Sequence, residues 1–230
     1  QFRQQRDSLR SSRKGKSKKE KKSINKQINK IKKILSRREA FINGMKTARK
    51  AAKNLSGDEK TAVDGSLDAY GDEHEANGVT VALGHKKQSE AGLAGIEDGQ
   101  VIVSIRPDAF SSDTLFMLIA HEGSHIIDAN MEILFNSPPM AKNFPVSGSE
   151  IRSSVTARET EYNAYSVSFW VLKGNNFSKA AGIGVVTYYN KGWSKIDTKK
   201  LNNALSKIYR GPNDQAGRNP AEWDVRGDWN

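Results

Sequence analysis

The sequence contains no cysteine, so no disulfide bond can stabilise the fold. It also has no run approaching the roughly 20 apolar residues of a transmembrane helix, so no membrane span is expected. Its first residues are polar and basic rather than apolar. Hydrophobic residues make up 36% of the 230 positions, which is enough for a chain of this length to bury a core. We therefore expect one domain, alone or with an appendage.

Negative charge is scarce at one end of the chain. Residues 1–53 hold 20 of the 37 Lys and Arg residues but only three of the 26 Asp and Glu residues. This segment therefore has a formal charge of +17, and the rest of the chain has −6, which together give the net +11. We divide the chain into a basic arm, residues 1–56, and a mildly acidic domain, residues 57–230.

The basic arm itself has two parts. Up to about Lys22 the sequence SSRKGKSKKEKK has almost nothing to bury, which predicts a solvated, mobile segment. Beyond it, apolar residues recur at helical spacing and predict an amphipathic helix: Ile24, Ile28, Ile31, Leu35 and Ile42. Three partners for the arm stay open, namely the domain or another chain, a nucleic-acid phosphate backbone, and an anionic membrane surface. No aromatic residues alternate with the basic ones to stack on bases.

The domain begins with strand signals and continues with helices. Residues 78–83 (GVTVAL) and 100–105 (QVIVSI) are short and rich in β-branched residues, so both are predicted as strands of a small sheet. Pro107 ends the second strand, and polar residues 111–113 can cap a helix that begins near Thr114. The pattern favours an α+β fold. A late helix is predicted from the spacing of Leu201, Leu205 and Ile208.

The predicted helix after Thr114 carries polar groups directly behind an apolar run, in TLFMLIAHEGSHIID. His121 and His125 are four residues apart, so their imidazoles share one face and can reach a common point. Glu122 lies about 100° round the helix, close enough to contact a water held there. This His-Glu-x-x-His pattern is the signature of zinc peptidases, and a bound cation would explain polar groups beside a buried run. A chance match is the alternative.

A catalytic zinc site needs a third protein ligand. In the long zincin motif, Gly and His would stand where this sequence has Asp128 and Met131, and no downstream Gly-Thr-x-x-Asp motif is present. A glutamate on a second helix remains, and residues 158–172 (RETEYNAYSVSFWVL) supply both Glu159 and Glu161. The helical face of Glu161 also carries three small or hydroxyl-bearing residues, Ala164, Tyr165 and Ser168.

Three segments, SIRPDAFSSDTL, AHEGSHIID and TEYNAY, resemble a known family. Over residues 96–172 the chain is similar to the gluzincin-like zincin metallopeptidase domains at the C-terminal ends of bacterial Rhs, haemagglutinin-type and other polymorphic toxins. The resemblance implies a zincin-like α+β fold with a small sheet and a central helix. It also implies a toxin or effector domain that is secreted, or delivered into a target cell, as part of a larger bacterial protein. A start at Gln1 rather than Met fits that expectation. A protein or peptide substrate and a cognate immunity or inhibitor protein would be its partners.

The resemblance also implies roles for individual residues. His121, His125 and Glu161 would hold Zn²⁺, and Glu122 would be the general base that activates a zinc-bound water for peptide hydrolysis. Glu161 is favoured over Glu159 because Ala164 follows it three positions later, as in the Glu-x-x-Ala form of these domains.

Further residues are candidates for support of the site. Asp128 shares the face of the two histidines, where it would hydrogen-bond a ligand imidazole or, alternatively, face solvent at the helix end. Residues 100–105 would form the edge strand along which an extended peptide binds. A donor to the transition state is expected from Tyr165, with four alternatives, Tyr188, Tyr189, His85 and Arg158.

Two other functions stay open. The chain could be a binding module whose arm contacts nucleic acid or a partner, with a structural or inactive metal site. It could also be a cell-wall peptide hydrolase with the same metal site. An enzyme requires Glu122, whereas a structural zinc site has no use for a base.

Overall fold

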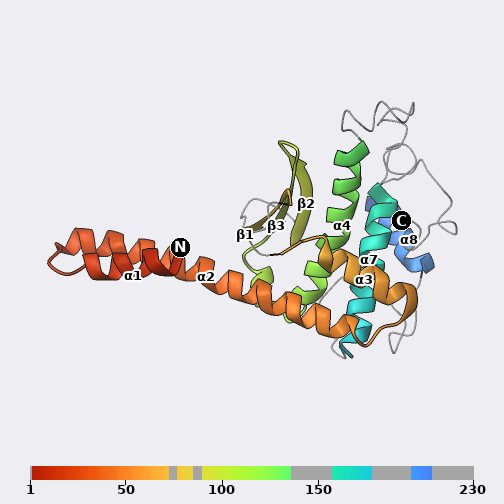
Figure 1. Cartoon of the computed structure of the whole chain (residues 1–230), viewed down its shortest axis with the longest axis horizontal. Coiled ribbons are helices and arrows are strands. Elements are labelled where there is room, and N and C mark those ends of the chain that lie inside the picture. The colour runs from red at the N-terminus through yellow and green to blue at the C-terminus, as the bar shows by residue number, and fades with distance from the viewer. Residues whose placement is uncertain (1, 73–76, 85–89, 136–156, 178–197, 209–230) are drawn as a thin grey trace.

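The computed structural model describes residues 2–72, 77–84, 90–135, 157–177 and 198–208 of the chain. The fold is α+β, as predicted, with one small sheet beside a group of helices (Figure 1). Its elements are α1 (Phe2–Ser12), α2 (Lys18–Ala52), α3 (Gly57–Asp68), β1 (Val79–Leu83), β2 (Gly92–Glu97), β3 (Gln100–Ile105), the short 3₁₀ helix η1 (Ala109–Ser111), α4 (Leu115–Phe135), α7 (Ala157–Gly174) and α8 (Thr198–Ile208). No helix within these ranges combines the length and apolarity that a membrane crossing requires.

The sheet has the order β1-β3-β2. β3 pairs in parallel with β1 and antiparallel with β2, and its side chains Val101, Val103 and Ile105 are fully buried. The prediction that residues 100–105 form the edge strand is therefore wrong, since β3 lies in the middle. β-Branched residues are common in strands that are buried and paired on both sides. The composition of residues 100–105 therefore predicted a strand, but it did not predict the position of that strand in the sheet.

β2 was not expected, and it is one of the two edge strands. A two-residue turn joins it to β3, because Glu97 stands opposite Gln100, and Asp98 and Gly99 both have positive φ angles of 50° and 73°. That geometry matches the Asp-Gly turns typical of tight hairpins. The glycines and alanine of β2 are weak strand formers, so pairing with β3 rather than local propensity determines this strand.

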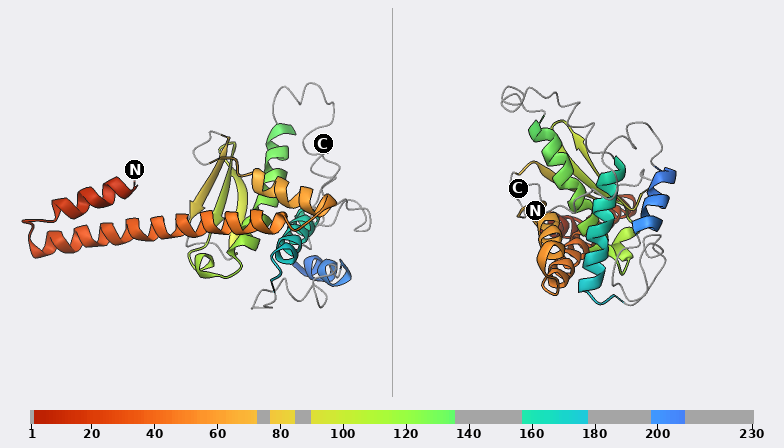
Figure 2. Two further views of the ribbon diagram at one scale, coloured as in Figure 1. Left: turned by 60° about the horizontal axis from the view of Figure 1, so that its bottom comes forward. Right: turned by 90° about the vertical axis from the view of Figure 1, so that its right-hand side faces the viewer.

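The basic arm is helical where a mobile segment was predicted. α1 folds back beside the first half of α2, and the two form a hairpin that projects away from the sheet and the other helices (Figure 2). Gly15 adopts a φ of 80° in the turn between them. A capping box then begins α2, in which the Ser17 backbone N–H donates to Glu20 Oε2 at 2.9 Å.

The second half of α2 belongs to the core of the domain. Its small residues Ala48, Ala51 and Ala52 are buried, and this half packs against α4 and α7. The Arg37 side chain reaches the sheet, where it donates to the Leu83 carbonyl at 3.4 Å. Of the three partners considered for the amphipathic helix, this half therefore binds the domain itself, and one continuous helix links the arm to the core.

α4 is the central helix, with α2, α3, α7 and the sheet around it (Figure 1). It begins one residue after the predicted start, and the Thr114 backbone N–H donates to Ser112 Oγ at 3.2 Å. Tyr70 is buried against α4 and donates its hydroxyl to the Ile119 carbonyl at 2.9 Å. At Gly123 a Cβ atom would collide with the Ser66 carbonyl oxygen, so glycine permits the close approach of α3.

α8 confirms the late helix that was predicted from the spacing of Leu201, Leu205 and Ile208. Leu201 and Leu205 are buried against Tyr162 of α7, as the helical spacing indicated, while the side chain of Ile208 lies outside the described part.

The end of α7 offers a test of this packing. A Cβ atom at Gly174 would overlap the Ala51 carbonyl oxygen of α2, so Gly174→Ala should destabilise the fold by about 1–3 kcal/mol. Gly65, inside α3, is the matched control, because its Cβ would meet only Ile127 Cδ1 at 4.0 Å. Gly65→Ala should stabilise by about 0.5–1 kcal/mol through helix propensity. Urea unfolding of both variants measures the two shifts, and equal shifts would contradict the proposed contact.

Candidate metal centre

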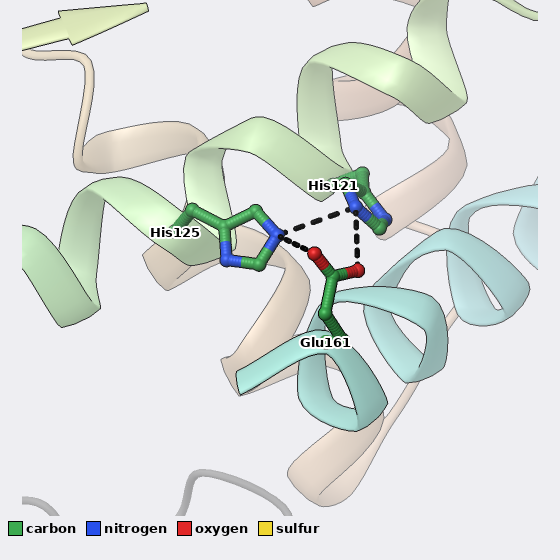
Figure 3. A group of neighbouring side chains, drawn as sticks. All are labelled: His121, His125 and Glu161. Atoms are coloured by element: carbon green, nitrogen blue, oxygen red, sulfur yellow. Dashed lines mark hydrogen bonds and ion pairs between the residues drawn. The ribbon is translucent and has the colours of Figure 1, made fainter. Parts of the chain in front are cut away.

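Two helices bring three potential metal ligands together. His121 and His125 come from α4 and Glu161 comes from α7, and their side chains point toward one another (Figure 3). The two histidine Nε2 atoms are 3.3 Å apart, and each lies 3.6 Å from a carboxylate oxygen of Glu161. One ligand atom from each residue lies within 4.8 Å of the others, so the group could hold a metal ion.

The donor set and its spacing fit a divalent transition metal. Imidazole nitrogen and carboxylate oxygen are ordinary ligands of Zn²⁺, which binds each at about 2.0–2.1 Å. Two ligands at that distance from a tetrahedral ion are roughly 3.3 Å apart, close to the 3.3 Å and 3.6 Å found here. The sequence predicted that these three side chains meet at one point, and in the structure they do.

The alternative ligand Glu159 is not part of this group. It lies two residues before Glu161 on α7, and its side chain is only 1% exposed. Two positions correspond to about 200° round a helix, so two glutamates so spaced cannot share one face.

Ser168 fixes the orientation of His121. The hydroxyl of Ser168 is 3.2 Å from His121 Nδ1, and it donates its single proton to the Ala164 carbonyl at 2.9 Å. It must then accept a hydrogen bond from Nδ1–H, which leaves the Nε2 lone pair directed at the ligand group. Ser168 had been assigned only to the face of Glu161, and its contact with the histidine was not predicted.

Asp128 supports the second histidine. Its carboxylate lies 3.7 Å from His125 Nδ1, on the side of the ring away from the ligand group, as predicted from the shared helical face. Burial lowers the pKa of His125, but the carboxylates of Asp128, Glu161 and Glu122 raise it by more, so the net shift is upward.

Glu122 is buried beside the ligand group. Its side chain is 3% exposed, and Oε2 has no hydrogen-bond partner among the residues that the structure describes. Burial raises the pKa of Glu122, an effect that the two histidines oppose and Glu161 reinforces. The carboxylate lies against Gly92, the first residue of β2, where a Cβ atom would overlap Oε1, Cδ and Cγ of Glu122. Gly92 was not identified from the sequence, although a glycine within a strand often marks such a close approach.

The candidates for a transition-state donor differ in position. The Tyr165 ring packs edge-on against His121, with ring centroids 5.0 Å apart, so this residue borders the group. Its proposed role stays a prediction. Three alternatives, Tyr188, Tyr189 and His85, and the side chain of Arg158 lie outside the described residues.

Comparisons with known proteins returned no match, whether against protein-family models, curated proteins or solved structures. The geometry and the sequence pattern therefore carry the functional argument.

The contact between Ser168 and His121 can be tested by metal affinity. Ser168→Ala should weaken binding of Zn²⁺ by about 10–100-fold, because the imidazole loses the group that fixes its tautomer. Ser166→Ala is the matched control, since Ser166 is equally buried and donates to the Tyr162 carbonyl in the same way. Competition with a fluorescent chelator gives both affinities, and equal losses would show that Ser168 acts only through helix stability.

Proposed function

We propose that the chain is a zinc-dependent peptidase. The observation that carries this proposal is the group of His121, His125 and Glu161, with the buried carboxylate of Glu122 next to it. A structural metal site needs four ligands and no base, whereas three ligands and an adjacent carboxylate are typical of hydrolytic zinc sites. The zincin-like fold and a role as a secreted toxin or effector domain are part of the proposal, and both rest on the resemblance over residues 96–172.

In this mechanism the ion would supply a Lewis acid that lowers the pKa of a water molecule and polarises the substrate carbonyl. Glu122 accepts the proton of the attacking water and returns it to the leaving amine. The raised pKa of Glu122 suits that cycle, because a carboxyl group whose pKa is closer to the operating pH can more readily take up the proton and then release it. Ser168 and Asp128 hold the two imidazoles in place through Nδ1.

Substrate binding is proposed along β2, not along β3 as the sequence had suggested. β2 is an edge strand, and its first residue, Gly92, contacts the Glu122 side chain. Leu93 and Ile96 on this strand are 50% and 37% exposed, so they can contact an apolar substrate side chain. An extended peptide paired with the outer edge of β2, which no other described strand occupies, would pass beside the proposed base.

The proposal is tested first by separating metal binding from cleavage. Native protein should hold one Zn²⁺ per chain and cleave unfolded casein. Glu122→Gln should keep the metal and lose cleavage by about 10²–10⁴-fold, since it removes only the base. Glu161→Gln should lose both, and Glu159→Gln, the matched control two residues away, should keep the metal. Metal content by mass spectrometry and casein cleavage are measured side by side.

Two results would contradict the assignment. A Glu122→Gln variant that cleaves casein at the native rate would rule out this residue as the base. A native protein that binds no divalent metal at micromolar concentration would rule out the site itself.

The contact of Gly92 with Glu122 gives a second prediction. Gly92→Ala should displace the carboxylate and lower kcat by up to about 10²-fold while the zinc content stays at one, because small misplacements of a catalytic group are costly. In the control Gly95→Ala, on the same strand, the added Cβ meets no atom within 4 Å, so kcat should not change. Steady-state kinetics on a fluorogenic peptide measures both, and an unchanged kcat for Gly92→Ala would refute the positioning role.

A further inference from the structure

A row of lysines follows one side of the projecting half of α2. Lys18, Lys22, Lys26, Lys30 and Lys33 are spaced by four, four, four and three residues, which places them on one helical face. All five are exposed, and none forms an ion pair with a carboxylate in the described part of the chain. We call these five residues the lysine row. From Lys18 to Lys33 the helix rises by about 22 Å at 1.5 Å per residue.

Local electrostatics does not account for the lysine row. Like charges four residues apart on a helix repel each other and weaken it. Residues 2–33 contain 14 Lys and Arg residues but only Asp7 and Glu20, and both carboxylates are already paired, with Arg6 at 2.9 Å and Lys16 at 3.4 Å. Among the described residues, most of the positive charge of the hairpin therefore has no carboxylate partner, so it is available to a partner of opposite charge.

We propose that the lysine row is a docking surface for the phosphate backbone of a nucleic-acid duplex, bound without readout of base sequence. A duplex presents one negative charge per about 1.7 Å of its axis, so a straight row of about 22 Å can face several phosphates. The hairpin projects away from the sheet and the remaining helices, so a long rod can approach it (Figures 1 and 2). This binding is additional to the proposed peptidase function and does not depend on it.

A membrane surface is a poorer partner for this hairpin. A helix that lies in a membrane interface inserts an apolar face. Here the apolar stripe is covered, since Ile28 and Ile31 are each only 6% exposed, and in the hairpin Phe2 is the one large hydrophobic residue recorded as exposed, at 43%. A single strand is also a poorer partner, because its binding relies on stacking with aromatic residues, and Phe2 is the only aromatic residue before Phe41.

The test is fluorescence anisotropy of the full chain with a labelled 20-base-pair DNA duplex, titrated with NaCl from 50 to 300 mM. Five phosphate contacts predict a slope of about −4.5 in a plot of log K against log salt concentration. A variant with all five lysines of the row changed to Gln should lose most of that slope and bind at least about tenfold more weakly at the lowest salt.

The matched control changes five other exposed lysines to Gln and so has the same net charge: Lys46, Lys50, Lys53, Lys199 and Lys207. It should keep the native slope. The single variant Lys26→Gln, which removes one contact without risk to the fold, should reduce the slope by about 0.9. Casein cleavage should be equal in all of these proteins, so failure of this inference and failure of the peptidase proposal are distinguishable.

Three results would overturn the inference. The first is a native chain that fails to bind the duplex at 50 mM NaCl. The second is a control variant that binds as weakly as the row variant, which would indicate diffuse charge. The third is binding to phosphatidylserine vesicles without binding to the duplex, which would indicate a membrane partner.

Discussion

The packing of α4 against α7 is the contact on which the proposed site depends. α4 contributes the two histidines and α7 the glutamate, so a small change in the separation of these helices would move the ligand atoms apart. Their close approach requires small residues, and Ala164 and Ser168 occupy the face of α7 nearest to His121. The neighbouring helices are fixed in the same way, because α3 meets α4 at Gly123 and α2 meets α7 at Gly174.

Burial of the polar ligand group costs electrostatic free energy, and neighbouring side chains offset only part of that cost. Ser168 lies within hydrogen-bond distance of Nδ1 of His121, and Asp128 lies 3.7 Å from Nδ1 of His125, but both Nε2 atoms face each other and the Glu161 carboxylate. When an imidazole is neutral and its Nδ1 carries the proton, Nε2 presents only a lone pair. Two such lone pairs and a carboxylate at 3.3–3.6 Å repel each other, and a shared cation turns that repulsion into attraction. A bound cation would therefore also explain why the apolar helix α4 carries two histidines.

Helical periodicity made much of the site predictable, whereas sheet order and close contacts were not. The spacing of His121 and His125 gives their shared face directly, whereas the choice of Glu161 over Glu159 came from the resemblance, through the Glu-x-x-Ala form that Glu161 and Ala164 match. The hairpin of β2 and β3 has a local signal in Asp98 and Gly99, a pair typical of tight turns. The order of strands depends on pairing between distant segments, so no short stretch of sequence contains it.

Two further features depended on contacts between distant residues. Ser168 and Gly92 act on His121 and Glu122 from separate elements, and nothing in their own neighbourhoods identifies those partners. The helical state of α1 likewise depends on α2, because an isolated helix of 11 residues is marginal in water and gains stability from packing. Composition alone therefore predicted a mobile segment.

The continuity of α2 relates the two proposed activities in space. Its 35 residues carry the lysine row at one end and core residues at the other, where Ala48 is fully buried and Gly44 contacts Ile119 of the central helix. From Lys26 to Ala48 the helix rises by about 33 Å at 1.5 Å per residue. A duplex on the lysine row would then hold the metal site at a fixed distance rather than on a flexible tether. Because that distance exceeds a Debye length of about 10 Å at 0.1 M salt, the charge of the duplex would scarcely alter the electrostatics of the site. Docking would therefore determine where the proposed peptidase acts, and the chemistry would depend on α4, α7 and β2, which lie outside the hairpin.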